Sequence, residues 1–383
     1  MANYKDIHGT NIETVTSDPS NPVNGQVWYN STDQALKGNA VTTAGAWASG
    51  GSMTDGRYGI GGAGTQNAAL GFAGLDNSPS ANSNSTETYN GSSWAEVSGL
   101  NKGRSVVGGA GTQTSALCFG GFDYPQNPSH VSVTETWDGS SWTEVSDLNT
   151  ARRQLAGCGA SNTAALAFGG AQDPGPFQAV TELWDGSSWT EVSDLSTARN
   201  LLGGVGISTA ALAFGGSTPS LTAKTETWNG SSWTETTDLN TARNYLAGAG
   251  LYTTALAFGG TTPPRVAITE EWNGSSWTET TDLNTATSAM GSTGINTAAL
   301  SFGGLAPGIT TATEEWTLTT VVGAWTTGGS MNTARKALGG AGTYTAALAF
   351  GGGGPNAQTE SYDGTSWTEV NDLNAARQVT GAG

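Results

Sequence analysis

Seven glutamates and six arginines recur at equivalent places along the chain, and they are the first candidates for chemistry. The glutamates are Glu87, Glu135, Glu182, Glu226, Glu270, Glu314 and Glu360. The arginines are Arg57, Arg104, Arg152, Arg199, Arg243 and Arg335. A catalytic acid usually occurs once, in an environment that shifts its pKa. Repetition therefore predicts that these residues form ion pairs or backbone caps that fix strands within or between structural units.

Other chemistry-bearing residues are sparse. His8 lies near the N-terminus and His130 in a variable stretch, so no histidine pair is placed for a metal or for a Ser-His-Asp arrangement. Cys118 and Cys158 are the two cysteines, and both fall on predicted interior strands, which indicates buried free thiols. Acidic turns such as that at Asp147 carry one carboxylate each, too few for a calcium loop. We predict no metal, no cofactor and no enzymatic activity.

The charge of the chain excludes some partners. Its 14 Lys and Arg stand against 31 Asp and Glu, a formal net charge of -17. Nucleic acids and anionic membrane surfaces bind through excess Lys and Arg, so we expect neither as a partner. The N-terminal sequence MANYKDIHGT resembles no signal peptide, and no run of about 18 apolar residues occurs. We expect synthesis in the cytoplasm and no membrane insertion.

Aromatic residues define a repeat that must position these side chains. Each repeat has four strand-length parts: a Gly-rich stretch, AALAFGG, TETW and SSWTEV. The Phe of the second part recurs as Phe72, Phe119, Phe168, Phe214, Phe258, Phe302 and Phe350. A period of 40 to 50 residues with four β-type segments is typical of propeller blades. The sequence therefore predicts an all-β, seven-bladed propeller over residues 44–383, preceded by an N-terminal attachment segment at 1–43.

The ends of the repeat region leave the closure of the predicted ring open. An extra segment at 45–53 precedes the first repeat, and an extra Gly-rich segment at 377–383 follows the last. A terminal strand often completes a blade begun at the other end of the chain, and the segment 377–383 could do so beside the first repeat. The alternative is that such a strand pairs with a neighbouring subunit, because an open edge strand is sticky.

The repeat resembles the kelch family over roughly residues 45–383. Arg152, Arg199 and Arg243 follow a short Thr-containing turn, a Gly pair follows an apolar strand, and a Trp closes the outer hairpin. The resemblance implies a propeller fold. Kelch propellers serve as adhesins, adaptors and occasional enzymes, so the resemblance alone selects no function.

Residues 25–38 form a second motif, GQVWYNSTDQALKG, which we expect to fold as a β-hairpin. Val27, Trp28 and Tyr29 lie on one arm and Leu36 on the other. The motif resembles a segment near the start of many bacteriophage tail-fibre and other virion proteins, and kelch-like repeats of this kind occur in marine phage proteins. The resemblance implies a virion appendage of the tail-fibre type that attaches to other virion proteins through these residues and forms a homo-oligomer.

The segments between FGG and TE differ most from repeat to repeat, and we expect them to ring one end of the propeller. The longest ones carry the residues predicted to bind a host-surface glycan or protein. These are Asp123, Tyr124, Gln126, Asn127, His130, Asp173, Phe177 and Gln178. Aromatic rings stack on sugar faces, while amides exchange hydrogen bonds with hydroxyl groups. The alternatives are a structural or decorative virion protein, in head or tail, that binds no receptor, and a carbohydrate-active propeller enzyme.

Overall fold

A computed structural model describes residues 13–16, 27–32, 35–38, 41–76, 82–123, 125, 129–322, 331–333, 335, 338–343, 346–352, 356–363 and 365–376. The described residues form strands, turns and bends and no helix, which confirms the all-β prediction. The chain divides into two compact units, one of Gly45–Leu318 and one of Met1–Ala44 with Thr319–Gly383. The repeat pattern, by comparison, predicts a single propeller over 44–383.

Within the described parts of the chain, seven four-stranded sheets each follow one repeat. Blade 1 contains β5 (Gly61–Thr65), β6 (Ala68–Phe72), β7 (Thr86–Tyr89) and β8 (Trp94–Val97). Blade 2 contains β9 (Gly108–Thr112), β10 (Ser115–Phe119), β11 (Thr134–Trp137) and β12 (Trp142–Val145). Blade 3 contains β13 (Ala156–Ser161), β14 (Ala164–Phe168), β15 (Thr181–Trp184) and β16 (Trp189–Val192). Blade 4 contains β17 (Gly203–Ile207), β18 (Ala210–Phe214), β21 (Thr225–Trp228) and β22 (Trp233–Glu235), with a small hairpin of β19 (Ser217–Thr218) and β20 (Ser220–Leu221).

The remaining sheets complete the set. Blade 5 contains β23 (Ala247–Leu251), β24 (Thr254–Phe258), β25 (Thr269–Trp272) and β26 (Trp277–Glu279). Blade 6 contains β27 (Gly291–Ile295), β28 (Ala298–Phe302), β29 (Thr313–Val322) and, as its outer strand, β4 (Val41–Ser49). The seventh sheet contains β30 (Gly339–Thr343), β31 (Ala346–Phe350), β32 (Thr359–Tyr362) and β33 (Trp367–Val370). The predicted number of four-stranded sheets is confirmed.

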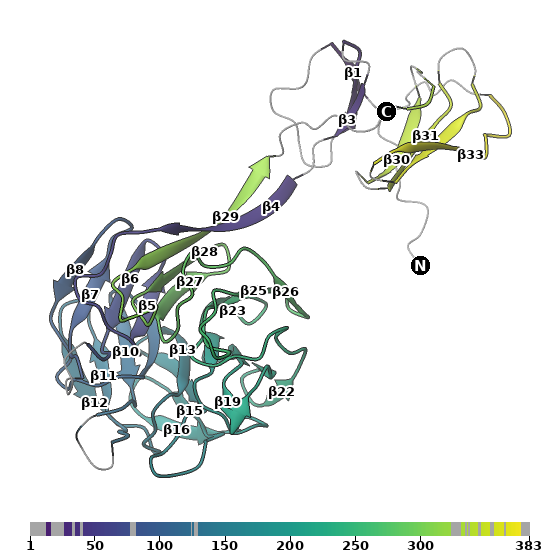
Figure 1. Cartoon of the computed structure of the whole chain (residues 1–383). Coiled ribbons are helices and arrows are strands. Elements are labelled where there is room, and N and C mark those ends of the chain that lie inside the picture. Colours follow the sequence, from purple (N-terminus) through teal and green to yellow (C-terminus); the bar gives the residue numbers. More distant parts are fainter. Residues whose placement is uncertain are drawn as a thin grey trace. The chain divides into compact units, whose positions relative to one another are not determined.

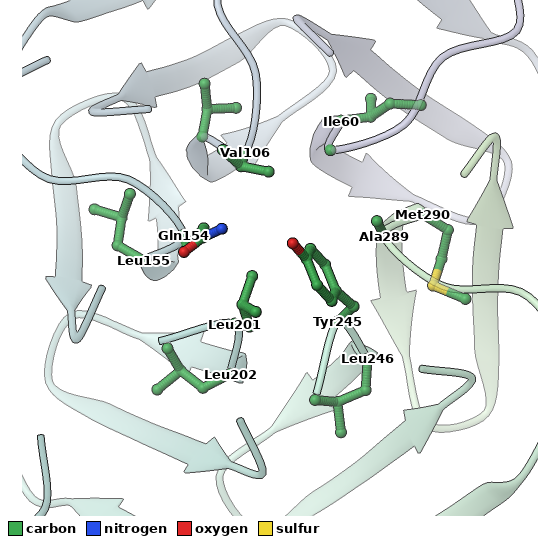
Figure 2. Close-up of a pocket in the computed structure, with 12 residues that line it drawn as sticks. Ile60, Val106, Gln154, Leu155, Leu201, Leu202, Tyr245, Leu246, Ala289 and Met290 are labelled. Carbon is green, nitrogen blue, oxygen red and sulfur yellow. The ribbon is translucent and has the colours of Figure 1, made fainter. Parts of the chain in front are cut away.

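Blades 1 to 6 form a closed ring in the unit Gly45–Leu318, whereas the seventh sheet belongs to the other unit (Figure 1). Each innermost strand contacts the next around a central hollow, and β27 of blade 6 contacts β5 of blade 1 (Figure 2). One hydrogen bond repeats at every junction: the indole N–H of the outer-strand Trp donates to the Thr hydroxyl that opens the third strand of the preceding blade. The pairs are Trp142 with Thr86, Trp189 with Thr134, Trp233 with Thr181, Trp277 with Thr225, Trp47 with Thr269, and Trp94 with Thr313.

The N-terminal overhang closes this ring. Trp47 of β4 takes the outer-strand place in blade 6, where it packs 4.8 Å from Phe258 and 5.5 Å from Trp316 between ring centroids. The part of 45–53 that lies in β4 therefore completes a blade begun at the other end of the repeats, a role that we expected 377–383 to take beside the first repeat. Trp325, which is the next Trp after Trp316 in the sequence, and segment 377–383 lie outside the described residues.

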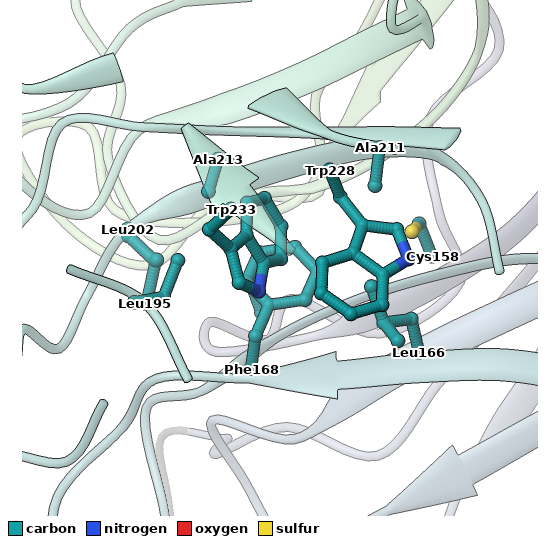
Figure 3. Packing of buried hydrophobic residues seen from close by; sticks show 10 residues of the cluster. Cys158, Leu166, Phe168, Leu195, Leu202, Ala211, Ala213, Trp228 and Trp233 are labelled. Carbon is teal, nitrogen blue, oxygen red and sulfur yellow. The ribbon is translucent and has the colours of Figure 1, made fainter. Parts of the chain in front are cut away.

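Aromatic packing between blades explains why Phe and Trp recur with this period. Phe168 of blade 3 and Trp233 of blade 4 lie 4.9 Å apart between centroids, in a buried cluster with Leu166 and Trp228 (Figure 3). The inner strands approach one another so closely that a Cβ on Gly157 would lie 2.4 Å from a ring carbon of Phe119. Close packing therefore requires glycine at this position.

The recurring Arg and Glu side chains form buried ion pairs within sheets, as predicted. Arg57 binds Glu87 at 2.6 Å, and the carboxylate also accepts the backbone N–H of Thr54. The same pair occurs as Arg104 with Glu135, Arg152 with Glu182, Arg199 with Glu226, Arg243 with Glu270, and Arg335 with Glu360. Blade 6 has Thr287 in place of Arg, and there Glu314 accepts the N–H of Asn284 at 2.7 Å and its amide at 2.8 Å.

The unit that contains the N-terminus has a three-stranded sheet of β1 (Glu13–Val15), β2 (Val27–Asn30) and β3 (Ala35–Gly38). β2 and β3 form the predicted antiparallel hairpin, in which Val27 pairs with Gly38, Trp28 with Lys37 and Tyr29 with Leu36. β1 adds a parallel third strand beside β2 that the sequence did not predict.

Candidate functional site

The variable loops and the connections between blades lie at the same end of the ring, which we call the loop end. In blade 3, Arg153 of the interblade connection forms an isolated antiparallel β-bridge with Ala171, and Ala171 forms a second one with Phe177 of the variable loop. The backbone N–H of Gly170 donates to the carbonyl of Arg199, which comes from the next connection. The two kinds of segment therefore build one surface, as expected from four-stranded blades.

The predicted binding residues lie at the loop end but do not form one cluster. His130 of blade 2 accepts the backbone N–H of Asp173 of blade 3 on Nδ1 at 3.1 Å, so these two are brought together. Asp123 is held by Lys102 at 3.0 Å. The side-chain amide of Gln178 donates a hydrogen bond to the carbonyl of Pro176, and Phe177 is half-buried. Tyr124, Gln126 and Asn127 lie outside the described residues.

Six residues, one from each blade, form a ring of backbone hydrogen bonds around the axis at this end. They are Gly59, Val106, Gln154, Leu201, Tyr245 and Ala289. Each N–H donates to the carbonyl of the equivalent residue in the preceding blade at 2.8 to 3.0 Å, and Gly59 donates to Ala289 to close the circle. We call this set the axial ring.

Every member of the axial ring has a left-handed backbone conformation, with φ from 48° at Val106 to 65° at Gly59. This conformation costs roughly 1 kcal/mol or more for a residue with a Cβ, and glycine is the usual choice. Five of the six members nevertheless carry side chains, including a β-branched one at Val106. Strain of this kind persists where the surrounding structure imposes it, and it is common at binding sites.

The axial ring surrounds a pocket of about 420 Å³, part of which is open solvent. Its wall is formed by the ring members and by the apolar residues that follow them, Ile60, Val107, Leu155, Leu202, Leu246 and Met290. Two polar side chains reach the centre: the phenol of Tyr245 and the amide of Gln154 (Figure 2). A largely apolar pocket with a few converging polar groups is the usual form of a small-ligand site.

Electrostatics at the pocket favour an uncharged ligand. Burial raises the pKa of the Tyr245 phenol, and this effect exceeds the opposing influence of the Arg153 charge and of the hydrogen bond with Gln154. The phenol therefore stays neutral and can donate a hydrogen bond near pH 7. Arg153 itself is paired with Asp173 at 2.9 Å and lies 5.0 Å from the ring of Phe122, so its charge is already compensated.

Beside the axial ring, two amide oxygens accept no hydrogen bond from a described group. Asn200 donates to Gln154 Oε1 at 2.7 Å and Asn244 donates to Ser217 Oγ at 2.9 Å, but Oδ1 of each is buried and unsatisfied. Buried acceptors are costly unless a ligand or solvent satisfies them. Neither asparagine lines the pocket itself, so these oxygens are unsatisfied acceptors next to the pocket wall.

The axial pocket offers binding groups rather than reactive ones. Among the residues that line it, only Tyr245 is titratable. Over the part of the chain that the structure describes, no group of three or more His, Cys, Asp or Glu side chains could hold a metal ion. Cys118 and Cys158 are buried free thiols, and burial raises their pKa to about 11 and about 12.

The axial ring is not among the predicted binding residues, although the sequence contains a signal for it. Two positions after the repeated Arg or its replacement, the residue is different in each of the six blades. Variation within a repeated scaffold is the same criterion that selects the long loops. The signal is weak because the residue before this position also varies, and the residue after it is only constant in being apolar.

No known family model and no curated protein sequence matches the chain. The described residues contain no helix long and apolar enough to cross a membrane.

Proposed function

We propose that the protein is a bacteriophage virion appendage of the tail-fibre type, which attaches by its N-terminal segment and binds a host-surface glycan through the loop end. The observation that carries this proposal is that the segments differing most between repeats, together with the axial ring, gather at one end of a repeated scaffold. A scaffold that repeats while one end diversifies suits recognition.

The chemistry of the axial pocket supports a neutral sugar unit as the group that is bound. Apolar walls formed by Leu202 and Leu246 suit the C–H face of a pyranose. The Tyr245 phenol and the Gln154 amide suit its hydroxyl groups, because both can donate and accept hydrogen bonds. The formal net charge of -17 disfavours strongly acidic polysaccharides.

Attachment through the N-terminal segment is supported by the hairpin of β2 and β3, which belongs to the compact unit that does not contain the ring. Val27, Trp28, Tyr29 and Leu36 lie in these two strands. An aromatic hairpin outside the ring is suited to pairing with other virion proteins, in agreement with the resemblance of its sequence to virion segments.

Glycan binding by the full-length protein tests the loop-end assignment. We expect binding to host cells and to a subset of neutral glycans on an array. Tyr245→Phe, which removes only the hydroxyl, should weaken binding by about tenfold, since one hydrogen bond contributes roughly 1 kcal/mol or more. Tyr252→Phe is the matched control, because Tyr252 is an exposed tyrosine of the same blade, in the turn after β23.

The outcomes separate the alternatives. Equal binding by wild type and both Tyr variants would remove the axial pocket from the site. Absence of any host-cell binding, with the protein present on purified particles by immunogold labelling, would favour a structural or decorative virion protein. Turnover of a bound glycan would favour a carbohydrate-active enzyme. Absence of the protein from particles would overturn the virion assignment itself.

A further inference from the structure

The seventh sheet has a face like those that blades 1 to 6 bury against their neighbours, but here part of it is exposed. Strand register places Leu348, Phe350, Thr359 and Val370 on this side, which we call the Leu348 face. Leu348 is 42% exposed and Val370 is 39% exposed. The equivalent leucines of the ring are all 0% exposed, namely Leu70, Leu117, Leu166, Leu212, Leu256 and Leu300.

A missing hydrogen bond marks the same face. In each ring blade, the Thr that opens the third strand accepts an indole N–H from the next blade, as Thr181 does from Trp233 at 3.0 Å. Thr359 is the equivalent residue of the seventh sheet, and its buried Oγ1 has no hydrogen-bond partner among the described residues. Leaving such a hydroxyl unsatisfied is costly, so the Leu348 face is built for a donor that the described residues of one copy do not supply.

The opposite side of the seventh sheet is also incomplete. In blade 1, Met53, Ile60, Ala69, Tyr89 and Trp94 pack with Leu300 and Phe302 of blade 6. The seventh sheet repeats this cluster as Met331, Leu338, Ala347, Tyr362 and Trp367, with Ala349. Among the described residues, no Leu and Phe from a preceding blade join it. Ala347 and Tyr362 are only partly buried here, whereas Ala69 and Tyr89 are fully buried. We call this side the Trp367 face.

We propose that the Leu348 face of one copy binds the Trp367 face of a second copy, head to tail. Leu348 and Phe350 then supply the pair that the Trp367 face lacks, and the Trp367 indole supplies the donor for Thr359. The Leu348 face carries no charged side chain in the register of β31, β32 and β33. The register also places Glu360 and Glu369 on the Trp367 face, where Glu360 is already paired with Arg335 at 2.6 Å. Within the ring, both faces of every blade already pack against a neighbouring blade, including Trp94 of blade 1 against Thr313 of blade 6.

The contact joins two different surfaces, so it can repeat from copy to copy. Such heterologous contacts generate closed rings or open filaments. Propellers typically have four to eight blades, so seventh sheets that pack like ring blades would close an assembly of about that many copies. Within this chain the same packing closes with six sheets.

Native mass spectrometry and sedimentation of the full-length protein test the proposal. We expect concentration-dependent association of the wild type. Leu348→Asp should weaken it by about a hundredfold, because a charge replaces an apolar side chain at the centre of the contact. Leu251→Asp is the matched control, because Leu251 is similarly exposed, at 47%, but belongs to blade 5 and not to the seventh sheet. This variant should associate like the wild type.

A mixing experiment tests the head-to-tail geometry. The Leu348→Asp chain keeps its Trp367 face, so adding it to wild type should cap assemblies and lower their mean mass in proportion to the dose. Failure of the variant to enter wild-type assemblies would replace the head-to-tail contact by one between two Leu348 faces. A wild type that stays monomeric at all concentrations, with amides of β31 as protected from hydrogen exchange as those of β28, would overturn the proposal in favour of a seven-bladed ring within one chain.

Discussion

Trp47→Phe is the change that most directly tests how the propeller closes. Trp47 belongs to β4, which precedes all the repeats in sequence but lies beside β29 as the outer strand of blade 6. If this strand closes the ring, the indole of Trp47 contributes to stability as much as an indole in a blade whose four strands are contiguous.

The expected loss in free energy of unfolding follows from two contacts of the Trp47 side chain. Trp47 Nε1 donates to Thr269 Oγ1 at 3.1 Å, and Thr269 is fully buried. Phenylalanine has no donor, so the hydroxyl is left unsatisfied at a cost of about 1–3 kcal/mol. Loss of the larger ring against Phe258 adds about 1 kcal/mol, so we expect a total of about 2–4 kcal/mol.

Urea unfolding of the full-length protein, followed by far-UV circular dichroism, measures this free energy, provided that the slope with denaturant stays unchanged. Trp142→Phe is the positive control. Trp142 belongs to blade 2, whose four strands are contiguous in sequence, and its indole makes the same hydrogen bond to Thr86 of blade 1 at 2.9 Å. Trp325→Phe is the second comparison, since a local hairpin would use Trp325 where the structure uses Trp47. A loss of about 2 kcal/mol or more for Trp325→Phe, with Trp47→Phe within about 0.5 kcal/mol of wild type, would refute closure by β4.

Two further changes test the interior. Arg152→Thr, which copies the Thr287 of blade 6, should lower the free energy of unfolding by about 3–5 kcal/mol, because it leaves the Glu182 carboxylate buried without its cation; a loss below about 1 kcal/mol in urea unfolding would contradict this role. Alkaline pH should destabilise the fold, since burial raises the pKa of Cys158 from 9.0 to about 12 and the unfolded thiol therefore ionises first. Stability should be constant below about pH 8.5 and then fall by about 1.4 kcal/mol per pH unit for each such thiol, and Cys158→Ala should show a shallower fall.

The repeat made the seven sheets predictable. It did not predict that six of them would form the ring and that the seventh would belong to the second unit. The strands that belong to a repeat have a signal in the sequence, such as the Phe of β14 or the Trp of β16, because period-two burial and blade contacts act on neighbouring residues. Closure depends on which two distant strands pair. The segment around Trp47 resembles that around Trp325, so the local sequence did not decide which one would complete blade 6.

The candidate site was predictable in position and only in part in composition. The loop end followed from the placement of the variable segments, and His130 and Asp173 do meet there. The axial ring did not follow, because a left-handed conformation at Val106 or Leu201 is contrary to the intrinsic preference of these residues. It arises from hydrogen bonds between blades, which a pattern within one repeat does not contain.

The axial ring also explains how this end of the scaffold can vary without losing its shape. Its hydrogen bonds join backbone groups only, so a change of side chain at a ring position removes none of them. Gly59 shows that the smallest residue is accepted, and Tyr245 shows that one of the largest is accepted, at nearly the same φ. The strain of a Cβ at these positions costs stability, yet glycine, which would remove that strain, occurs at one position of six. Selection for fold stability alone would favour glycine throughout, so the side chains retained around the axis are better explained by what they contact in the pocket.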